Sequence, residues 1–171
     1  MKKHILKRND AYSLVELIIV LAIMAILSGV AVLTISVISN GRVTAAKDTF
    51  DTEISALITR TKTQDADNAI CLVRNGNEYE VYYGTSTDGV SFTANDPNNP
   101  DKNLNKCDIY YSEDGSTPTL VTSLVIKFRK TDGSCIAGYG TYYFCKTNKD
   151  YDRYLSKLTI SQATGSHYSG E

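Results

Sequence analysis

Side chains able to act in catalysis are few in this 171-residue sequence, which contains only two histidines and four cysteines. His4 lies in a basic N-terminal segment, and His167 lies in a Ser/Gly-rich tail. Neither is accompanied by a paired-carboxylate, nucleophile-elbow or phosphate-loop pattern. The sequence therefore predicts a protein that is not an enzyme and needs no cofactor, with His167 a solvated surface residue.

The cysteines are Cys71, Cys107, Cys135 and Cys145. Their successive separations of 36, 28 and 10 residues include no close pair of the kind that a zinc site uses. An even number of cysteines in an exported domain predicts disulfides, with three possible pairings. Cys71 with Cys107 and Cys135 with Cys145 would close the shortest loops, but the sequence does not select a pairing, and free buried thiols are the alternative.

The polar segment 94–105 carries four oxygen-bearing side chains: Asp96, Asn98, Asp101 and Asn103. Their spacing lacks the EF-hand order and its closing glutamate. The segment is therefore predicted to be a solvated loop, and no metal site is predicted.

Glu16 stands immediately before residues 17–38, which contain no charge and no proline. As a helix this run would be roughly 33 Å long, enough to cross a bilayer. Four basic residues and one acidic residue precede it, which predicts a cytoplasmic N-terminus and an outward-facing remainder. An ionised carboxylate near the hydrocarbon costs roughly 2.5 to 3.5 kcal/mol, so Glu16 is expected to have a partner.

Two ordinary explanations of this segment fit less well. A secretory signal has an apolar region of about 7 to 15 residues, which is shorter than this run, although residues 37–39 form an acceptable cleavage site. A plain signal anchor fits the length and the flanking charges but gives Glu16 no role.

Residues 11–17, "AYSLVEL", resemble the processing site of type IV pilins and pseudopilins. In that family a peptidase cuts after a glycine that is followed by Phe-Thr-Leu-Val-Glu. The resemblance implies cleavage between Ala11 and Tyr12 and N-methylation of Tyr12. It also implies that Glu16, at the fifth position of the processed chain, meets the N-terminal amine of a neighbouring subunit. Ala11 replaces the usual glycine and Tyr12 the usual phenylalanine, which keeps the small and aromatic character of the two positions.

Beyond residue 39 the helix is expected to continue as an amphipathic segment to about residue 64. Its apolar side chains recur at steps of three and four residues: Val43, Ala46, Phe50, Ile54, Leu57 and Ile58. This stripe is the surface on which a globular head would pack. Asp65, Asp67 and Asn68 indicate the end of the helix.

The remaining sequence is typical of strands and turns. Residues 69–84 predict a hairpin that turns at an Asn-Gly signal. Further strands are predicted within 123–134, 140–146 and 154–161. The fold class is therefore α+β, with one long N-terminal helix packed on a mostly antiparallel β-sheet. Segments of 126–165 also resemble, less specifically, H-type minor pseudopilins of type II secretion systems and minor pilins of competence pili.

Charge is unevenly distributed. Residues 65–120 carry +3 and −10, whereas residues 121–171 carry +7 and −4. Such a division suits contacts between oppositely charged faces of neighbouring subunits. The alternative is a phosphate-binding patch for DNA, formed by Lys127, Arg129, Lys146, Lys149, Arg153 and Lys157. Acidic residues interrupt that patch, so the sequence favours a solvated or subunit-facing surface.

The whole pattern predicts a leader peptide (1–11), an apolar helix (12–39), an amphipathic helix (40–64) and an extracellular head (65–171). By resemblance, the chain is a filament subunit, with a minor pilin or pseudopilin favoured over a major one. It begins as a single-pass precursor in the cytoplasmic membrane and ends in a filament on the cell surface. Its implied partners are other pilin subunits, prepilin peptidase, an assembly platform and an ATPase. A membrane-anchored binding module that does not polymerise and a DNA-binding competence pilin are the alternatives.

Overall fold

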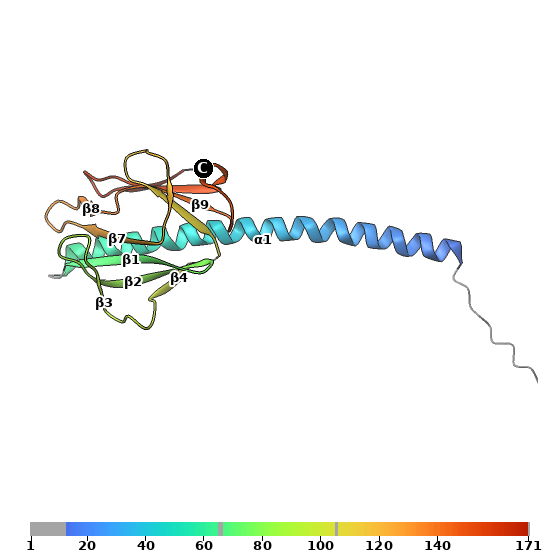
Figure 1. Cartoon of the computed structure of the whole chain (residues 1–171), viewed down its shortest axis with the longest axis horizontal. Coiled ribbons are helices and arrows are strands. Elements are labelled where there is room, and N and C mark those ends of the chain that lie inside the picture. The colour runs from blue at the N-terminus through green and yellow to red at the C-terminus, as the bar shows by residue number, and fades with distance from the viewer. Residues whose placement is uncertain (1–12, 65–66, 105, 171) are drawn as a thin grey trace, which may run out of the picture. The chain divides into compact units, whose positions relative to one another are not determined.

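The computed structural model describes residues 13–64, 67–104 and 106–170, with the backbone alone for 30–35. The chain divides into two compact units, Met1–Ile38 and Ser39–Glu171. Helix α1 (Leu14–Thr63) contributes to both of them (Figure 1). The second unit, here called the head, also contains every strand.

In the first unit, α1 begins after Ser13, whose side-chain oxygen accepts a hydrogen bond from the backbone amide of Glu16 at 3.2 Å. This is the bond of an N-cap serine, because the first amides of a helix have no carbonyl partner within it. No proline interrupts the helix, and Ser28 bonds back to the carbonyl of Met24 at 2.7 Å without breaking it.

In the head, the last part of α1 buries the apolar stripe expected from the sequence. Val43, Ala46, Phe50, Ile54 and Leu57 are completely buried. Ile58 packs against the same core as a partly buried residue. The three- and four-residue spacing places these side chains on one helix face, and the prediction of that face is confirmed.

One sheet has the strand order β3-β2-β1-β7-β8, with β4 also paired to β2. Its strands are β1 (Asn68–Asn75), β2 (Glu78–Thr85), β3 (Thr93–Ala94), β4 (Lys102–Leu104), β7 (Ser123–Phe128) and β8 (Cys135–Ala137). All its pairs are antiparallel. Strands β1 and β2 form the hairpin predicted from the Asn-Gly signal, with Asn75 opposite Glu78. The two-residue turn places Gly76 at φ +62°, which glycine adopts readily.

The second sheet has the order β11-β10-β9-β5-β6 and is also antiparallel. It consists of β5 (Asp108–Ser112), β6 (Thr119–Leu120), β9 (Gly140–Cys145), β10 (Ser156–Ile160) and β11 (His167–Gly170). A 3-10 turn, η1 (Tyr151–Arg153), lies between β9 and β10.

Both sheets pack against the head part of α1, and Figure 1 shows them beside it. Phe50 contacts Tyr142 and Phe144 of β9, with ring centroids 5.0 and 5.8 Å apart. Towards the other sheet, the Tyr83 hydroxyl of β2 donates to the buried Glu53 carboxylate. The Arg60 guanidinium lies 3.8 Å from the centre of the Tyr83 ring. One helix thus supplies the core for two sheets.

Three details differ from the sequence-based expectations. The head contains two sheets rather than one, because β1, β2 and β7 pair in one sheet and β9 and β10 in the other, a division set by pairing between distant segments. Segment 94–105 is not entirely a loop, because Lys102–Leu104 pairs with β2 as β4. Lys127, which alternates with apolar residues in β7, is buried at 5% exposure.

Candidate functional site

Glu16 lies in the first turn of α1, and its side chain is exposed. Among the residues that the structure describes, the Glu16 carboxylate makes no hydrogen bond or ion pair. Its neighbours Val15 and Leu17 expose 63% and 56% of their surface. Within the described residues, the Glu16 carboxylate is therefore an exposed charge without a partner on an apolar helix surface. Ala11 and Tyr12, the predicted cleavage and methylation site, lie outside the described residues.

The apolar side chains of the first unit are exposed around the helix. They are Leu14, Val15, Leu17, Ile18, Ile19, Val20, Leu21, Ile23, Met24, Ile26, Leu27, Val37 and Ile38. Within residues 13–64, 67–104 and 106–170, no helix has both the length and the apolar character required to cross a membrane. An apolar surface of this extent indicates a site of contact with a partner.

All four cysteines are buried free thiols. Cys71 and Cys135 belong to the first sheet, whereas Cys145 ends β9 and Cys107 directly precedes β5 in the second. Neither of the two shortest-loop pairs therefore lies within one sheet. Burial raises the pKa of Cys107, Cys135 and Cys145 to about 12. Disulfide formation stays a prediction, and these thiols are poor nucleophiles as they stand.

His167 is not the freely solvated residue expected from its Ser/Gly-rich surroundings. Its Nε2 atom lies 3.2 Å from Asp51 Oδ1 and 3.1 Å from Ser55 Oγ, both on α1. A catalytic triad would require the acid at Nδ1 and the serine at Nε2, whereas here both approach Nε2. This cluster therefore attaches β11 to the helix and does not have the geometry of a nucleophilic site.

The basic patch considered for DNA is not one continuous surface. Lys127 Nζ donates to Asp67 Oδ1 at 2.9 Å and to the carbonyls of Ser86 and Thr87. Arg129 is paired with Asp132 at 3.1 Å. Lys127 is buried and engaged with protein acceptors, so it cannot serve as the phosphate contact that its position in the sequence suggested.

The aspartates of the polar segment 94–105 accept hydrogen bonds from nearby protein groups. Asp96 accepts hydrogen bonds from the Asn98 amide and the Asn99 side chain. Asp101 accepts from the backbone amide of Tyr83 at 2.7 Å. In the part of the chain that the structure describes, no three histidine, cysteine, aspartate or glutamate side chains are grouped so as to hold a metal ion.

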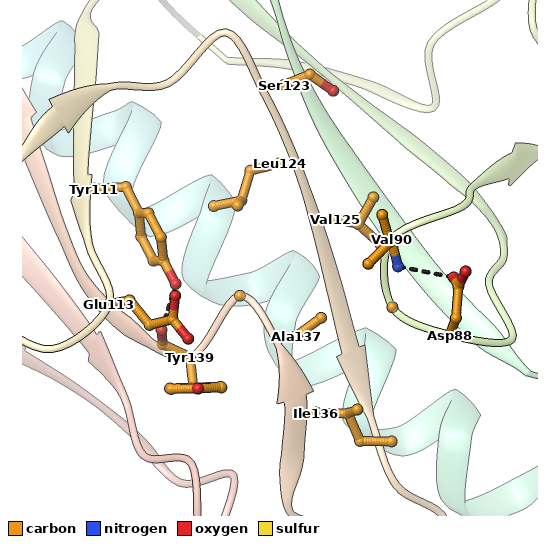
Figure 2. Close-up of a pocket in the computed structure, with 12 residues that line it drawn as sticks. Asp88, Val90, Tyr111, Glu113, Ser123, Leu124, Val125, Ile136, Ala137 and Tyr139 are labelled. Atoms are coloured by element: carbon orange, nitrogen blue, oxygen red, sulfur yellow. Dashed lines mark hydrogen bonds between the residues drawn. The ribbon is translucent and has the colours of Figure 1, made fainter.

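A cavity of about 410 Å³ lies beside β7 and β8, and Figure 2 shows the residues that line it. Leu124, Val125 and Ile136 supply apolar wall, and Asp88 and Tyr111 are also at its margin. Asp88 accepts hydrogen bonds from the next turn, including the Val90 amide at 2.9 Å, and these bonds lower its pKa to about 2.

The other polar groups of this cavity have partners too. The Tyr111 hydroxyl donates to the Tyr139 carbonyl at 2.6 Å. A hydrogen bond from the Tyr139 hydroxyl to Glu113 raises the pKa of Tyr139. No general base stands beside a nucleophile here, so the arrangement suits packing or binding rather than catalysis.

Comparison with known proteins gives one match. Residues 6–32 match the family described as "Prokaryotic N-terminal methylation motif". No curated protein and no solved structure matches the chain. The matched segment contains Glu16 and the beginning of α1, where the exposed apolar side chains lie. The chain thus carries the prokaryotic N-terminal methylation motif at residues 6–32, which supports a type IV pilin-like or pseudopilin-like protein.

Proposed function

We propose that this chain is a minor subunit of a type IV pilus-like filament and that it functions by assembling through its N-terminal helix. The match of residues 6–32 to the methylation motif carries this proposal. The exposed apolar side chains of the first unit support it, because an apolar helix surface is stable only when lipid or other helices cover it.

Processing comes first. Prepilin peptidase cuts between Ala11 and Tyr12, and the new N-terminus at Tyr12 is methylated. The basic leader (1–11) keeps this end in the cytoplasm, while residues 12–39 hold the precursor in the membrane. Residues 40–64 and 65–171 then lie outside as the amphipathic helix and the strand-containing part of the head.

Glu16 gives this scheme a chemical test. Its carboxylate has no partner among the described residues, and the side chains around it are apolar. A buried unpaired charge is strongly destabilising, whereas a charge that meets an opposite charge in a low-dielectric setting is well stabilised. The protonated amine at Tyr12 of a neighbouring subunit supplies that opposite charge. Glu16 therefore selects the axial position at which one helix docks on the next.

Assembly then moves the helix from lipid into a bundle of like helices, driven by a membrane platform and an ATPase. Packing the apolar helices together keeps them away from water after they leave the bilayer. The head stays on the outside of the filament. The head's oppositely charged segments, 65–120 and 121–171, favour contacts between successive subunits.

The test compares the native chain with a Glu16→Gln variant in cells that contain the processing and assembly machinery. Intact mass and N-terminal sequencing are expected to find a start at Tyr12 with an added methyl group. The variant is expected to be cut in the same way but to be absent from sheared surface filaments. Asp48→Asn removes an exposed carboxylate farther along the same helix and is expected to assemble normally.

Two outcomes would overturn the proposal. An uncut chain starting at Met1 would indicate a plain membrane anchor that carries a binding module. A start at Asn40 would indicate an ordinary secreted protein. A chain cut at Tyr12 whose Glu16→Gln form still enters filaments would retain the pilin-like assignment and remove the docking role of Glu16.

A further inference from the structure

A cavity of about 450 Å³ lies on the outer face of the second sheet. Tyr143 of β9 lines it, and its side chain alternates with those of Tyr142 and Phe144, which pack towards α1. Tyr151 and Tyr154, from η1 and the residue that follows it, also line the cavity. Three tyrosines from two segments therefore surround one depression on the face opposite the core.

Neighbouring aromatic rings hold these tyrosines in place. The Tyr143 and Tyr154 rings meet edge to face, with centroids 5.2 Å apart. The Tyr151 ring lies 6.1 Å from that of Tyr110, which is paired with Tyr143 across β5 and β9. Such contacts limit ring movement, so a ligand would find the aromatic surfaces already arranged.

The core does not require Tyr151, the one aromatic residue of η1. No residue of η1 is buried, and Tyr151 is 37% exposed. The core side of the second sheet is filled instead by Tyr142, Phe144 and Leu158, which are completely buried. A surface turn that presents an aromatic ring without burying it has area available for a ligand.

Hydrogen-bond donors and acceptors both lie beside the tyrosine rings. Thr117 offers a hydroxyl, Asp152 offers a carboxylate, and Lys157 offers an ammonium group 5.6 Å from the Tyr154 ring centre. Ser116 also lines the cavity, with its hydroxyl bound to Asp114. One acid and one base leave the cavity without a dominant charge. Its chemistry thus combines flat apolar surface, hydrogen-bond donors and hydrogen-bond acceptors.

We propose that this tyrosine cavity binds a neutral sugar unit of an oligosaccharide. A pyranose ring presents an apolar face of C–H groups, which suits a tyrosine ring, and an edge of hydroxyls that both donate and accept hydrogen bonds. A single-stranded nucleic acid would also stack on these rings. Its phosphates would however meet Asp152, and Lys157 is the lysine among the lining residues. The adjacent Lys149 and Arg153 are matched in sequence by Asp150 and Asp152, so the site is not a basic one.

The test uses the full-length chain in a detergent whose head group is not a sugar. The probes are an immobilised panel of neutral oligosaccharides built from glucose, galactose, mannose and N-acetylhexosamines. At least one is expected to bind, with little change from low to high salt, because no ion pair is involved. Tyr151→Ala is expected to weaken that binding about tenfold, and Tyr151→Phe, which keeps the ring, is expected to retain it.

Tyr168→Ala is the matched control, because Tyr168 is 61% exposed on β11 and does not line the cavity. It is expected to leave binding unchanged. Absence of binding to every oligosaccharide, or binding that Tyr151→Ala leaves intact, overturns the proposal. Salt-sensitive binding of an oligothymidylate in place of the sugars also overturns it. The measurement needs no filament, so its outcome is separate from that of the assembly test.

Discussion

Arg74 and Asp108 join the two sheets of the head, with Arg74 Nη2 2.8 Å from Asp108 Oδ1. Arg74 belongs to β1 and Asp108 to β5, in different sheets. The second carboxylate oxygen of Asp108 accepts a hydrogen bond from the Asn148 amide at 2.6 Å. One buried carboxylate therefore ties together both sheets and the turn after β9.

Asp108→Ala is expected to lower the free energy of unfolding by about 3 kcal/mol, because it leaves the Arg74 charge and the Asn148 amide without their acceptor. Denaturant titration of the full-length chain in mild detergent measures this loss. Asp48→Ala removes an exposed partner of Lys47 and is expected to cost less than about 1 kcal/mol. Equal losses in the two variants would contradict the bridging role of Asp108.

Gly165 and Gly76 share the same left-handed backbone angle, φ +62°, but have different surroundings. A Cβ on Gly165 would lie 2.0 Å from the Gly133 carbonyl oxygen and 3.0 Å from the Phe128 ring. A Cβ on Gly76 would meet no atom within 4 Å. The pair therefore separates the cost of the backbone angle from the cost of a clash.

Gly76→Ala is expected to destabilise the head by about 1 kcal/mol through backbone strain alone. Gly165→Ala is expected to cost at least about 3 kcal/mol, since the carbonyl of Gly133 must also move. Thermal unfolding measures both, with each kcal/mol lowering the Tm by roughly 2 to 4 °C in a protein of this size. Similar Tm values for the two variants would show that residue 165 is less tightly packed than the structure indicates.

The burial of the cysteines predicts how slowly their thiols react with an alkylating reagent. Burial raises the pKa of the Cys107, Cys135 and Cys145 thiols to about 12 from a usual 9.0, so the thiolate fraction near pH 8 falls about a thousandfold. These three thiols are therefore expected to resist alkylation at about pH 8 while the chain is folded, which mass mapping of the labelled peptides measures. Faster labelling of the folded chain at that pH would contradict this burial.

Denaturation without reductant separates thiols from disulfides. Four alkyl groups added on unfolding, counted by intact mass, are expected for the free thiols of this structure. Two or none would indicate one or two disulfides in the exported protein.

Much of the fold follows from local patterns. The stripe from Val43 to Leu57 has the period of a helix, and a stripe with that period must face a core. The hairpin of β1 and β2 follows from Gly76 between β-branched and aromatic runs: Gly76 and Asn77 form the two-residue turn, and few other residues adopt the φ of +62° that Gly76 has there. The α+β class with antiparallel pairing was predictable because the helix period and the hairpin signal both depend on residues close together in the chain.

Other features depend on partners that are distant in the chain. Lys127 has the spacing of an exposed residue, yet it is buried because Asp67 and two carbonyls of the 86–87 segment surround its ammonium group. The short strands β6, β8 and β11 have two to four residues each, and only pairing with a neighbour makes them strands.

The sequence by itself determined the methylation motif at residues 6–32 and the helix that it begins, because both depend on residues adjacent in the chain, namely Glu16 and an uninterrupted apolar run. Only the tertiary structure decided which polar side chains remain available. Within the head, Lys127 is bound to Asp67 and Asp108 to Arg74, and His167 contacts Asp51 of α1. Tyr143, Tyr151 and Tyr154 line one cavity. Such groupings arise from sheet register and packing between distant segments, which local sequence does not encode.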